Sequence, residues 1–133
     1  MIANDVLKIG LAEALGALSH HFEPFVTVFE RRDVSVELFV PMAVDAQEPH
    51  ARDEIYVVVL GEAEFVRDGQ RAHVSGGDIL YVPARAAHRF EQFSDDFQTW
   101  AIFFGPEQPA QALGQGAGAE PVGLNKKPRH PRA

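Results

Sequence analysis

Apolar residues between Phe25 and Phe104 come in short runs separated by turn-forming residues, which is the pattern of β-strands rather than helices. The runs predict strands at residues 25–30, 34–40, 55–60, 62–67, 70–74, 79–82, 87–93 and 97–104. Asp68-Gly69 is a strong hairpin signal between two of them. Short strands with a turn signal about every eight to twelve residues favour a β-sandwich or β-barrel over an α/β fold.

In two of these strands the order of apolar and polar residues also predicts which faces are buried. Between Val34 and Val40, apolar residues alternate with Ser35 and Glu37, as in a strand with one apolar and one polar face. Residues 55–60 are apolar at every position and rich in β-branched side chains, so they predict a central strand.

The first part of the chain has a helical period instead. Five apolar residues fall at positions i, i+4, i+7, i+8 and i+11: Leu7, Leu11, Ala14, Leu15 and Leu18. Asn4 and Asp5 are residue types that cap helices, so the pattern predicts a helix from Asn4 or Asp5 to about Leu18. Its single apolar stripe is expected to pack against the outside of the β-domain.

After Gly105-Pro106 the strand pattern stops. Residues 106–133 are rich in Gly, Ala, Pro and Gln and end in a basic segment, which is the composition of a tail. The sequence therefore predicts three parts: an N-terminal helix and lead-in at residues 1–23, one β-domain at 24–105, and a C-terminal tail at 106–133.

Composition narrows the possible partners. The chain of 133 residues carries a formal net charge of −7, which argues against a phosphate-binding groove for nucleic acid and against attraction to anionic lipid. It has no cysteine, which excludes disulfides and thiolate chemistry. We see no apolar run of transmembrane length and no signal peptide pattern, and we expect a cytoplasmic protein with no membrane or nucleic-acid partner.

A cluster of residues that commonly bind metals precedes the central strand. Glu48 and His50 are two apart, so in an extended chain they share a face at about 6.6 Å, within reach of one ion. His50 and Glu54 would be about 13 Å apart in a straight strand, so residues 51–53 must form a corner if both bind the same ion. His88, from a later strand, would complete the site.

Two neutral imidazoles and one carboxylate form the ligand set that Fe(II) favours and that Mn, Ni, Co or Zn also accept. The sequence thus predicts a site for a divalent transition metal, with Fe, Mn, Ni or Zn as the candidates. A plain ion pair between His50 and Glu54 is the alternative.

The spacing of these residues resembles the cupin superfamily, in particular its small single-domain members. The first cupin motif is Gly, His-x-His, three or four residues, Glu, six residues and Gly, and His50, Glu54 and Gly61 match that spacing. The second motif is Gly, five residues, Pro-x-Gly, two residues, His, three residues and Asn. Its matches here are Gly77, Pro83 and His88. The resemblance covers roughly residues 24–105.

Three positions depart from the motifs. Glu48 replaces the first histidine of His-x-His, Arg85 stands where the second motif has Gly, and Gln92 stands where it has Asn. Glu48 is either a fourth ligand beside His50, Glu54 and His88, or it leaves three protein ligands with open positions on the metal. Gln47 is expected to point to the other face because of its odd parity relative to His50.

The resemblance implies an all-β fold, the cupin-type double-stranded β-helix or jelly-roll barrel, with a short N-terminal helix. By strand parity Tyr56 should point into the barrel with Glu54, and Gln92 should line the same cavity as His88. Tyr56 and Gln92 are therefore candidate catalytic residues for proton transfer or orientation. Three aromatic residues are expected to form the interior walls: Phe65, Phe90 and Trp100.

The outward parity of Ile55, Val57 and Val59 predicts an apolar outer face that needs cover. The N-terminal helix or a second subunit could supply it, and we predict a homodimer.

The resemblance implies a metal-binding protein that acts on or binds a small organic molecule. An enzyme would be a dioxygenase-like oxidoreductase, an isomerase or a decarboxylase. The alternative is a non-catalytic ligand-binding or sensor protein, and a metal-free sugar-nucleotide epimerase-like barrel is disfavoured by the acidic charge. Fold alone does not decide between these functions.

Overall fold

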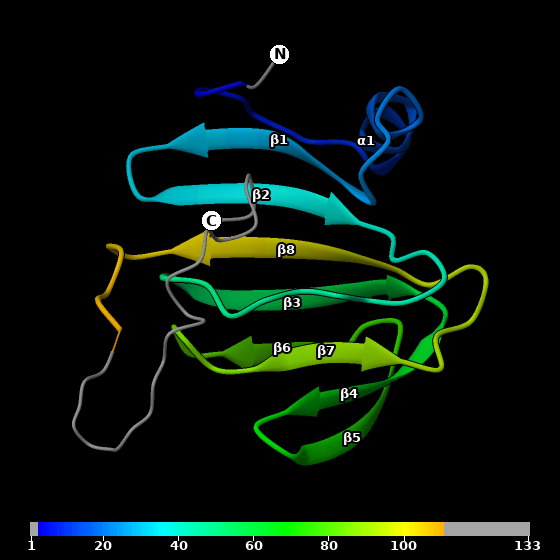
Figure 1. The fold of residues 1–133 in the computed structure, drawn as a ribbon. Helices are drawn as coiled ribbons and strands as arrows, with labels where there is room; N and C mark the ends of the chain where they lie inside the picture. Colours follow the sequence, from blue (N-terminus) through cyan, green and yellow to red (C-terminus); the bar gives the residue numbers. More distant parts are fainter. Residues whose placement is uncertain (1–2, 111–133) are drawn as a thin grey trace.

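A computed structural model describes residues 3–110 of the chain (Figure 1). One helix and eight strands lie in this range: α1 Leu11–Leu18, β1 Phe25–Arg31, β2 Val34–Phe39, β3 Asp53–Leu60, β4 Glu62–Arg67, β5 Gln70–Ser75, β6 Ile79–Val82, β7 His88–Glu91 and β8 Gln98–Phe104. Every predicted strand is present, although β7 is shorter than the predicted 87–93. Of the predicted tail, residues 111–133 lie outside the described residues.

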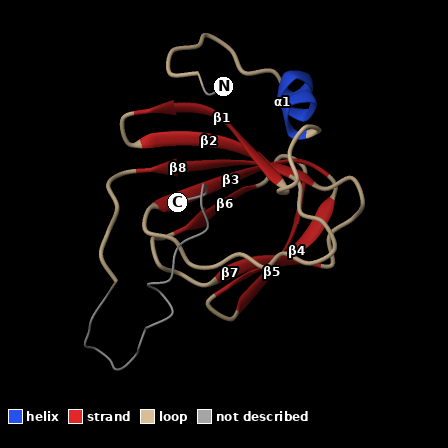
Figure 2. Ribbon diagram, turned by 45° about the horizontal axis from the view of Figure 1, so that its top comes forward, coloured by secondary structure: helices blue, strands red, loops and turns tan. Residues whose placement is uncertain are grey.

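The strands form two antiparallel sheets that face one another (Figures 1 and 2). The larger sheet has the order β1-β2-β8-β3-β6 and the smaller one β5-β4-β7. The chain passes from the larger sheet to the smaller at Gly61, between β3 and β4, with a φ of 84°. A side chain at Gly61 would meet the Cα of Phe97 at 2.6 Å, so this crossing needs glycine.

The interior between the sheets is a single core made mostly of aromatic rings. Its buried aromatic residues are Phe25, Phe39, Tyr56, Phe65, Phe90, Phe97 and Phe103. Phe90, on the smaller sheet, lies with its ring centroid 4.9 Å from that of Tyr56 and 4.9 Å from that of Phe97. Because Tyr56 belongs to the larger sheet, these contacts join the two sheets.

Alternation along β2 is the reverse of the usual arrangement. Ser35 and Glu37 are 4% and 1% exposed and share a face with Phe39, which belongs to the interior core. Leu38 points the other way and is buried beneath α1. On this strand, therefore, the apolar Leu38 belongs to an outer cluster, whereas the polar Ser35 and Glu37 face the interior beside Phe39.

Helix α1 covers part of the outer face of the larger sheet (Figure 2). Ala14 packs there against Val26 and Leu38, with Leu11, Leu15, Leu18 and Trp100 around them. The predicted packing of the helix outside the β-domain is thus confirmed. Trp100 belongs to this outer cluster, so its predicted place in the interior is wrong; the inward positions of β8 are Thr99, Ala101 and Phe103.

The predicted start of the helix at Asn4 is wrong, because α1 begins at Leu11 after Gly10. The segment before it runs along β1 instead: the amide of Glu30 donates to the carbonyl of Ala3, and Ala3 bridges Phe29 in parallel. Leu7 is fully exposed and takes no part in the apolar stripe. Pairing with an unpaired strand edge has replaced the first helical turns.

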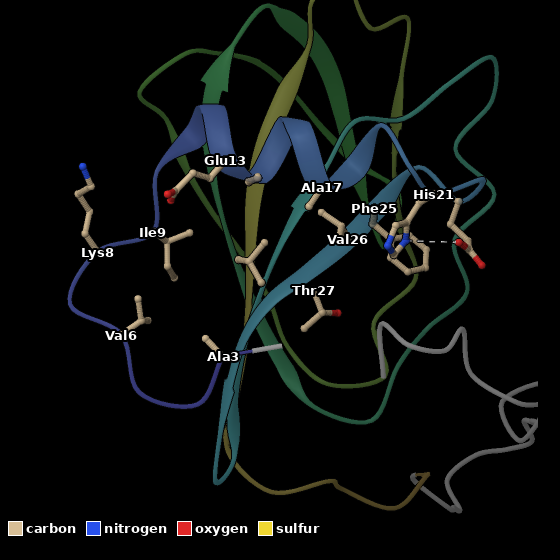
Figure 3. Close-up of a pocket in the computed structure, with 13 residues that line it drawn as sticks. Ala3, Val6, Lys8, Ile9, Glu13, Ala17, His21, Phe25, Val26 and Thr27 are labelled. Atoms are coloured by element: carbon tan, nitrogen blue, oxygen red, sulfur yellow. Dashed lines mark ion pairs between the residues drawn. The ribbon is translucent and has the colours of Figure 1, made fainter. Parts of the chain in front are cut away.

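A pocket of about 610 Å³ lies between this segment, α1 and β1, outside the barrel (Figure 3). Val6, Ile9, Ala17 and Val26 line it with other residues, and His21 at its end pairs with Glu23 at 3.8 Å. No helix among residues 3–110 is both long and apolar enough to span a membrane.

Candidate metal centre

His50, Glu54 and His88 meet inside the barrel. The Nε2 atom of His50 lies 2.7 Å from Oε1 of Glu54, and the Nε2 atom of His88 lies 3.4 Å from the same oxygen. Within residues 3–110, these are the three side chains whose potential ligand atoms all lie within 4.8 Å of one another. Ligand bonds of about 2.0–2.2 Å allow one ion to reach all three.

The three candidate ligands come from one strand of each sheet and from the segment before β3. Glu54 is the second residue of β3, His88 is the first residue of β7, and His50 belongs to the irregular segment before β3. The chain bends at Ala51 and Arg52, which lets His50 turn back toward Glu54. This is the corner that the distance argument required.

A hydrogen bond from Nδ1 to a backbone carbonyl fixes the orientation of each imidazole. Nδ1 of His50 lies 2.9 Å from the carbonyl oxygen of Arg52, and Nδ1 of His88 lies 2.9 Å from that of Ala86. A carbonyl only accepts hydrogen bonds, so both Nδ1 atoms must carry the proton. In the neutral rings both Nε2 lone pairs then point at Glu54, which is the tautomer that binds metal through Nε2.

The site is closed to solvent. His50 is 2% exposed, Glu54 0% and His88 5%. The ring centroids of the two histidines are 4.8 Å apart, and the ring of Phe103 meets His50 edge-on at 4.9 Å. Tyr56 lies at 6.2 Å from His88 by ring centroid. The aromatic walls exclude water and strengthen electrostatic interactions inside.

The loops around the site are tied together by backbone hydrogen bonds. The amide of Arg85 donates to the carbonyl of His50 at 2.7 Å, and that of Gln108 donates to the carbonyl of Ala51 at 2.8 Å. Oδ1 of Asp53 accepts from the amide of Ala84 at 2.8 Å. Asp53 therefore supports the loop that leads to His88.

Arg85, where the motif has glycine, adopts a positive φ of 74°. Its guanidinium donates from Nε and Nη2 to the carbonyl of Gln108 at 3.1 and 2.8 Å. The position keeps the backbone conformation for which glycine is favoured, while the side chain holds the start of the C-terminal segment.

The structure does not bring Glu48 to the cluster, since its side chain is exposed. The inward residue of this segment is Gln47, contrary to the expectation from parity. Its Oε1 accepts a hydrogen bond from the Tyr56 hydroxyl at 3.0 Å, and its Nε2 donates to Asp45 at 2.7 Å. Parity fails because residues 40–52 do not form a strand.

Tyr56 points into the barrel as predicted and is fully buried. Gln92 does not line the interior: β7 ends at Glu91, and Gln92 is exposed with a φ of 50°. The chain turns one residue before the alternation of β7 would have carried Gln92 inside.

Sequence reasoning missed two buried carboxylates. Asp45 is 6% exposed and accepts the amide hydrogen of Phe90 at 2.8 Å, which fixes residues 40–52 to the edge of β7. Glu37 faces the interior on β2, opposite Ala101 of β8, which in turn is opposite Tyr56 of β3. A signal was available, because an alternating strand whose apolar residues face a covering helix places its polar residues inside.

His73 lies away from the cluster of His50, Glu54 and His88, on β5, and is exposed as expected. Both ring nitrogens lie 3.0 Å from carboxylates, Nδ1 from Glu64 and Nε2 from Glu62. The hydrogen bond with Glu64, with the further help of Glu62, raises the pKa of His73 above its ordinary value. His20 and His21 are exposed.

Comparisons with known proteins agree with this architecture. A family profile described as a cupin domain matches residues 35–100. An uncharacterised protein of Streptomyces coelicolor is 36% identical over 85 residues, which cover 62% of this chain and 81% of that protein.

Solved structures have the same fold. KdgF from Halomonas sp. is 26% identical, with a TM-score of 0.56 and coverage of 63% of this chain and 83% of that one. A Cupin 2 conserved barrel domain protein from Salinispora arenicola is 19% identical, with a TM-score of 0.56 and coverage of 77% and 90%. The predicted fold class is confirmed.

Proposed function

The chain belongs to the cupin family, and on that premise we propose that it is a mononuclear metal-binding cupin that acts on a small organic molecule. The proposed ligands are His50, Glu54 and His88. The proposed metal is a divalent transition ion, with Fe, Mn, Ni or Zn as the candidates, because two imidazoles and one carboxylate suit each of them.

One observation carries the proposal: two Nε2 atoms converge on one carboxylate oxygen in a closed interior. With both Nδ1 protons committed to carbonyls, a single extra proton could satisfy only one of the two nitrogens. Protonating both imidazoles would place two cations side by side without water, which is costly. A divalent cation satisfies all three lone pairs at once, and the buried Nε2 of His88 has no hydrogen-bond partner within residues 3–110.

The protein's own residues would orient the substrate and exclude water from the site. A bound metal would act as a Lewis acid or activate oxygen at the positions left open by three protein ligands. Tyr56 is the proposed residue for orienting a substrate or moving a proton, because its buried hydroxyl is held by Gln47 in a defined direction. The surrounding rings of Phe65 and Phe90 suit an apolar or aromatic substrate body.

Metal analysis of protein purified without chelators tests the site. We expect stoichiometric metal in the wild type and its loss in His50→Ala/His88→Ala. His20→Ala/His21→Ala is a matched control, since it removes two exposed histidines and should keep the metal. Wild-type protein that is metal-free and cannot be reconstituted would overturn the proposal.

Glu48→Gln tests the number of ligands. Because Glu48 is exposed, we expect the metal affinity of this variant to match that of the wild type. A marked loss of affinity would restore Glu48 as a fourth ligand.

A non-catalytic ligand-binding or sensor cupin is the second candidate. A substrate reaches His50 and Glu54 only if a covering segment moves. Oxygen consumption by the metal-loaded protein against diketones, thiols and catechols separates the two. Turnover that Tyr56→Phe slows supports the enzyme, whereas saturable binding without consumption supports the sensor.

We also propose that the chain forms a homodimer through the larger sheet. On its outer face Tyr81 pairs with Ile55 and Ile79 with Val57, and Ile79 and Tyr81 are 69% and 47% exposed. Helix α1 covers only the other side of this face, over Val26. An exposed apolar sheet face of this kind is typical of an interface.

Light scattering at micromolar concentration tests the dimer. We expect a dimer for the wild type, a monomer for Ile79→Lys, and a dimer for Ala72→Lys, an equally charged change on exposed β5. A strictly monomeric wild type would refute this interface.

A further inference from the structure

A second cavity lies beside the metal centre, where the β1–β2 hairpin meets the start of β3. Its volume is about 730 Å³, and its lining includes Arg31, Arg32 and Arg52 together with Ser35. Asp5 and Glu30 also line it, so three arginines and two carboxylates give the lining a formal charge of +1. The whole chain carries −7. The cavity is therefore a local reversal of the protein's charge.

The three arginines are not neutralised by partners. Among residues 3–110 none of them forms an ion pair with a carboxylate, including the two that line the same cavity. Nη1 of Arg31 donates to the backbone carbonyl of Asn4 at 3.4 Å, and Arg32 is exposed. Other arginines in this range, such as Arg71 and Arg89, do pair with a carboxylate.

Arg52 is the most fixed of the three. Its Nη2 donates to Oγ of Ser35 at 2.9 Å, its Nη1 lies 3.4 Å from the carbonyl of Asp33, and its guanidinium stacks 5.6 Å above the ring centroid of Phe103. All these acceptors are neutral, and its buried Nε has no hydrogen-bond partner among the described residues. A guanidinium has five N–H donors, so one hydrogen on each Nη nitrogen stays available.

We propose that this cavity binds the carboxylate or phosphate group of a small molecule, with Arg52 as the fixed donor and the exposed Arg31 and Arg32 as further donors. Arginine is the side chain best suited to such groups, because its planar donors match two oxygens at once. A pre-held guanidinium loses little conformational freedom on binding. An oxyanion would supply the negative charge that the lining lacks.

The cavity is linked to the metal centre through a single residue. The carbonyl of Arg52 accepts the Nδ1 hydrogen of His50, while its guanidinium lies against Phe103, whose ring contacts His50. The oxyanion site does not depend on the proposed metal, however, because all its donors belong to the chain. Its test can be run on protein treated with a chelator.

The experiment is a titration of the full chain, with and without chelator, using inorganic phosphate, malonate and chloride at constant ionic strength. Calorimetry measures affinity, and the amide signals of Ser35 and Arg52 report the place of binding. We expect saturable binding of phosphate or malonate and none of chloride. The tighter of the two tells whether phosphate or carboxylate is the natural group.

Variants locate the site. Arg31→Gln/Arg32→Gln changes two exposed residues and should weaken binding about tenfold, as the loss of charge-assisted contacts predicts. Arg52→Lys keeps the charge but loses the fork, and should also weaken binding. Arg71→Gln/Arg89→Gln removes the same charge from the other sheet and should leave affinity unchanged.

The outcomes are distinct. Chloride binding as tight as that of phosphate and malonate, or binding that is unaltered in Arg31→Gln/Arg32→Gln, overturns the oxyanion site. Equal weakening in Arg71→Gln/Arg89→Gln also overturns it, because net charge would then be the cause. Wild-type protein that binds the oxyanion but holds no metal and cannot be reconstituted with metal would refute only the metal proposal.

Discussion

The two sheets of the barrel are alike inside and opposite outside. Their inner faces share one aromatic core and one ligand cluster. The outer face of the larger sheet is apolar, with Leu38 beneath α1 and Ile79 exposed. The outer face of the smaller sheet carries ion pairs, such as Arg71 with Glu91 at 2.9 Å. The inner face of each sheet packs against the other sheet, whereas each outer face reflects its own contact with the helix or with water.

The largest expected effect is in the interior that both sheets share. Phe90→Ala removes a ring that contacts Phe39, Tyr56, Phe65 and Phe97. We expect a loss of about 3–5 kcal/mol in the free energy of unfolding, as for other buried aromatic truncations. Urea unfolding followed by fluorescence and circular dichroism measures it. Separate transitions by the two probes would mean that the sheets do not share one cooperative core.

The next effect contrasts the two outer faces. Leu38→Ala opens a cavity beneath α1, where Leu38 is fully buried, and should cost about 2–4 kcal/mol. Arg71→Ala breaks an exposed ion pair and should cost less than about 1 kcal/mol. Equal losses in thermal or urea unfolding would show that the outer faces do not differ as their packing indicates.

The crossing between the sheets can be compared with a turn inside one of them. Gly61 and Gly69 have φ values of 84° and 86°, but only at Gly61 would a Cβ meet backbone, at 2.6 Å. Gly69→Ala should therefore cost only the strain of a left-handed residue, about 1–2 kcal/mol. Gly61→Ala should cost more than that, and similar unfolding midpoints for the two variants would contradict the crowding at the crossing.

The smallest effect is a pH dependence on the charged face. The carboxylate of Glu64, with Glu62, raises the pKa of His73 above its ordinary value. The stabilisation that His73 contributes is therefore complete below its unfolded-state pKa of about 6.5. It is lost as pH rises through the higher pKa of His73 in the folded state. Comparison of wild type with His73→Gln between about pH 5.5 and 8.5 should show a stability difference that shrinks with rising pH.

Acidic pH provides the internal control for His73. Hydrogen bonds from Arg71 and Arg89 lower the pKa of Glu91, so its contribution is present above its unfolded pKa and is lost as pH falls through the lower folded value. That loss lies well below the range in which His73 titrates. A stability difference for His73→Gln that grows with rising pH would contradict the assignment.

Local patterns along the chain were sufficient to predict the strands and the approach of His50 to Glu54. Residues 55–60 form a central strand because apolar residues at every position demand cover on both faces. His50 and Glu54 require a bend between them if they are to meet, and the bend lies at Ala51 and Arg52. These predictions held because spacing and turn chemistry act over a few residues.

Patterns failed where an element ended or where its neighbour was unknown. Gln92 was assigned to the interior by an alternation that stops one residue earlier, at Glu91. Trp100 was assigned to the interior because it is aromatic, but its strand faces a helix on that side. Gln47 points inward and Glu48 outward, the reverse of the prediction, because their segment is not an extended strand.

The sequence by itself determined that the chain is an all-β barrel with a histidine–carboxylate cluster, since periodicity and motif spacing are properties of the chain alone. Only the tertiary structure decided which polar residues lie inside. Glu37 and Asp45 are buried because other elements of the fold pack over them. Arg52 lines a cavity because residues from distant parts of the chain meet around it. Burial depends on which element packs against a strand, and the sequence of one strand does not determine which element that is.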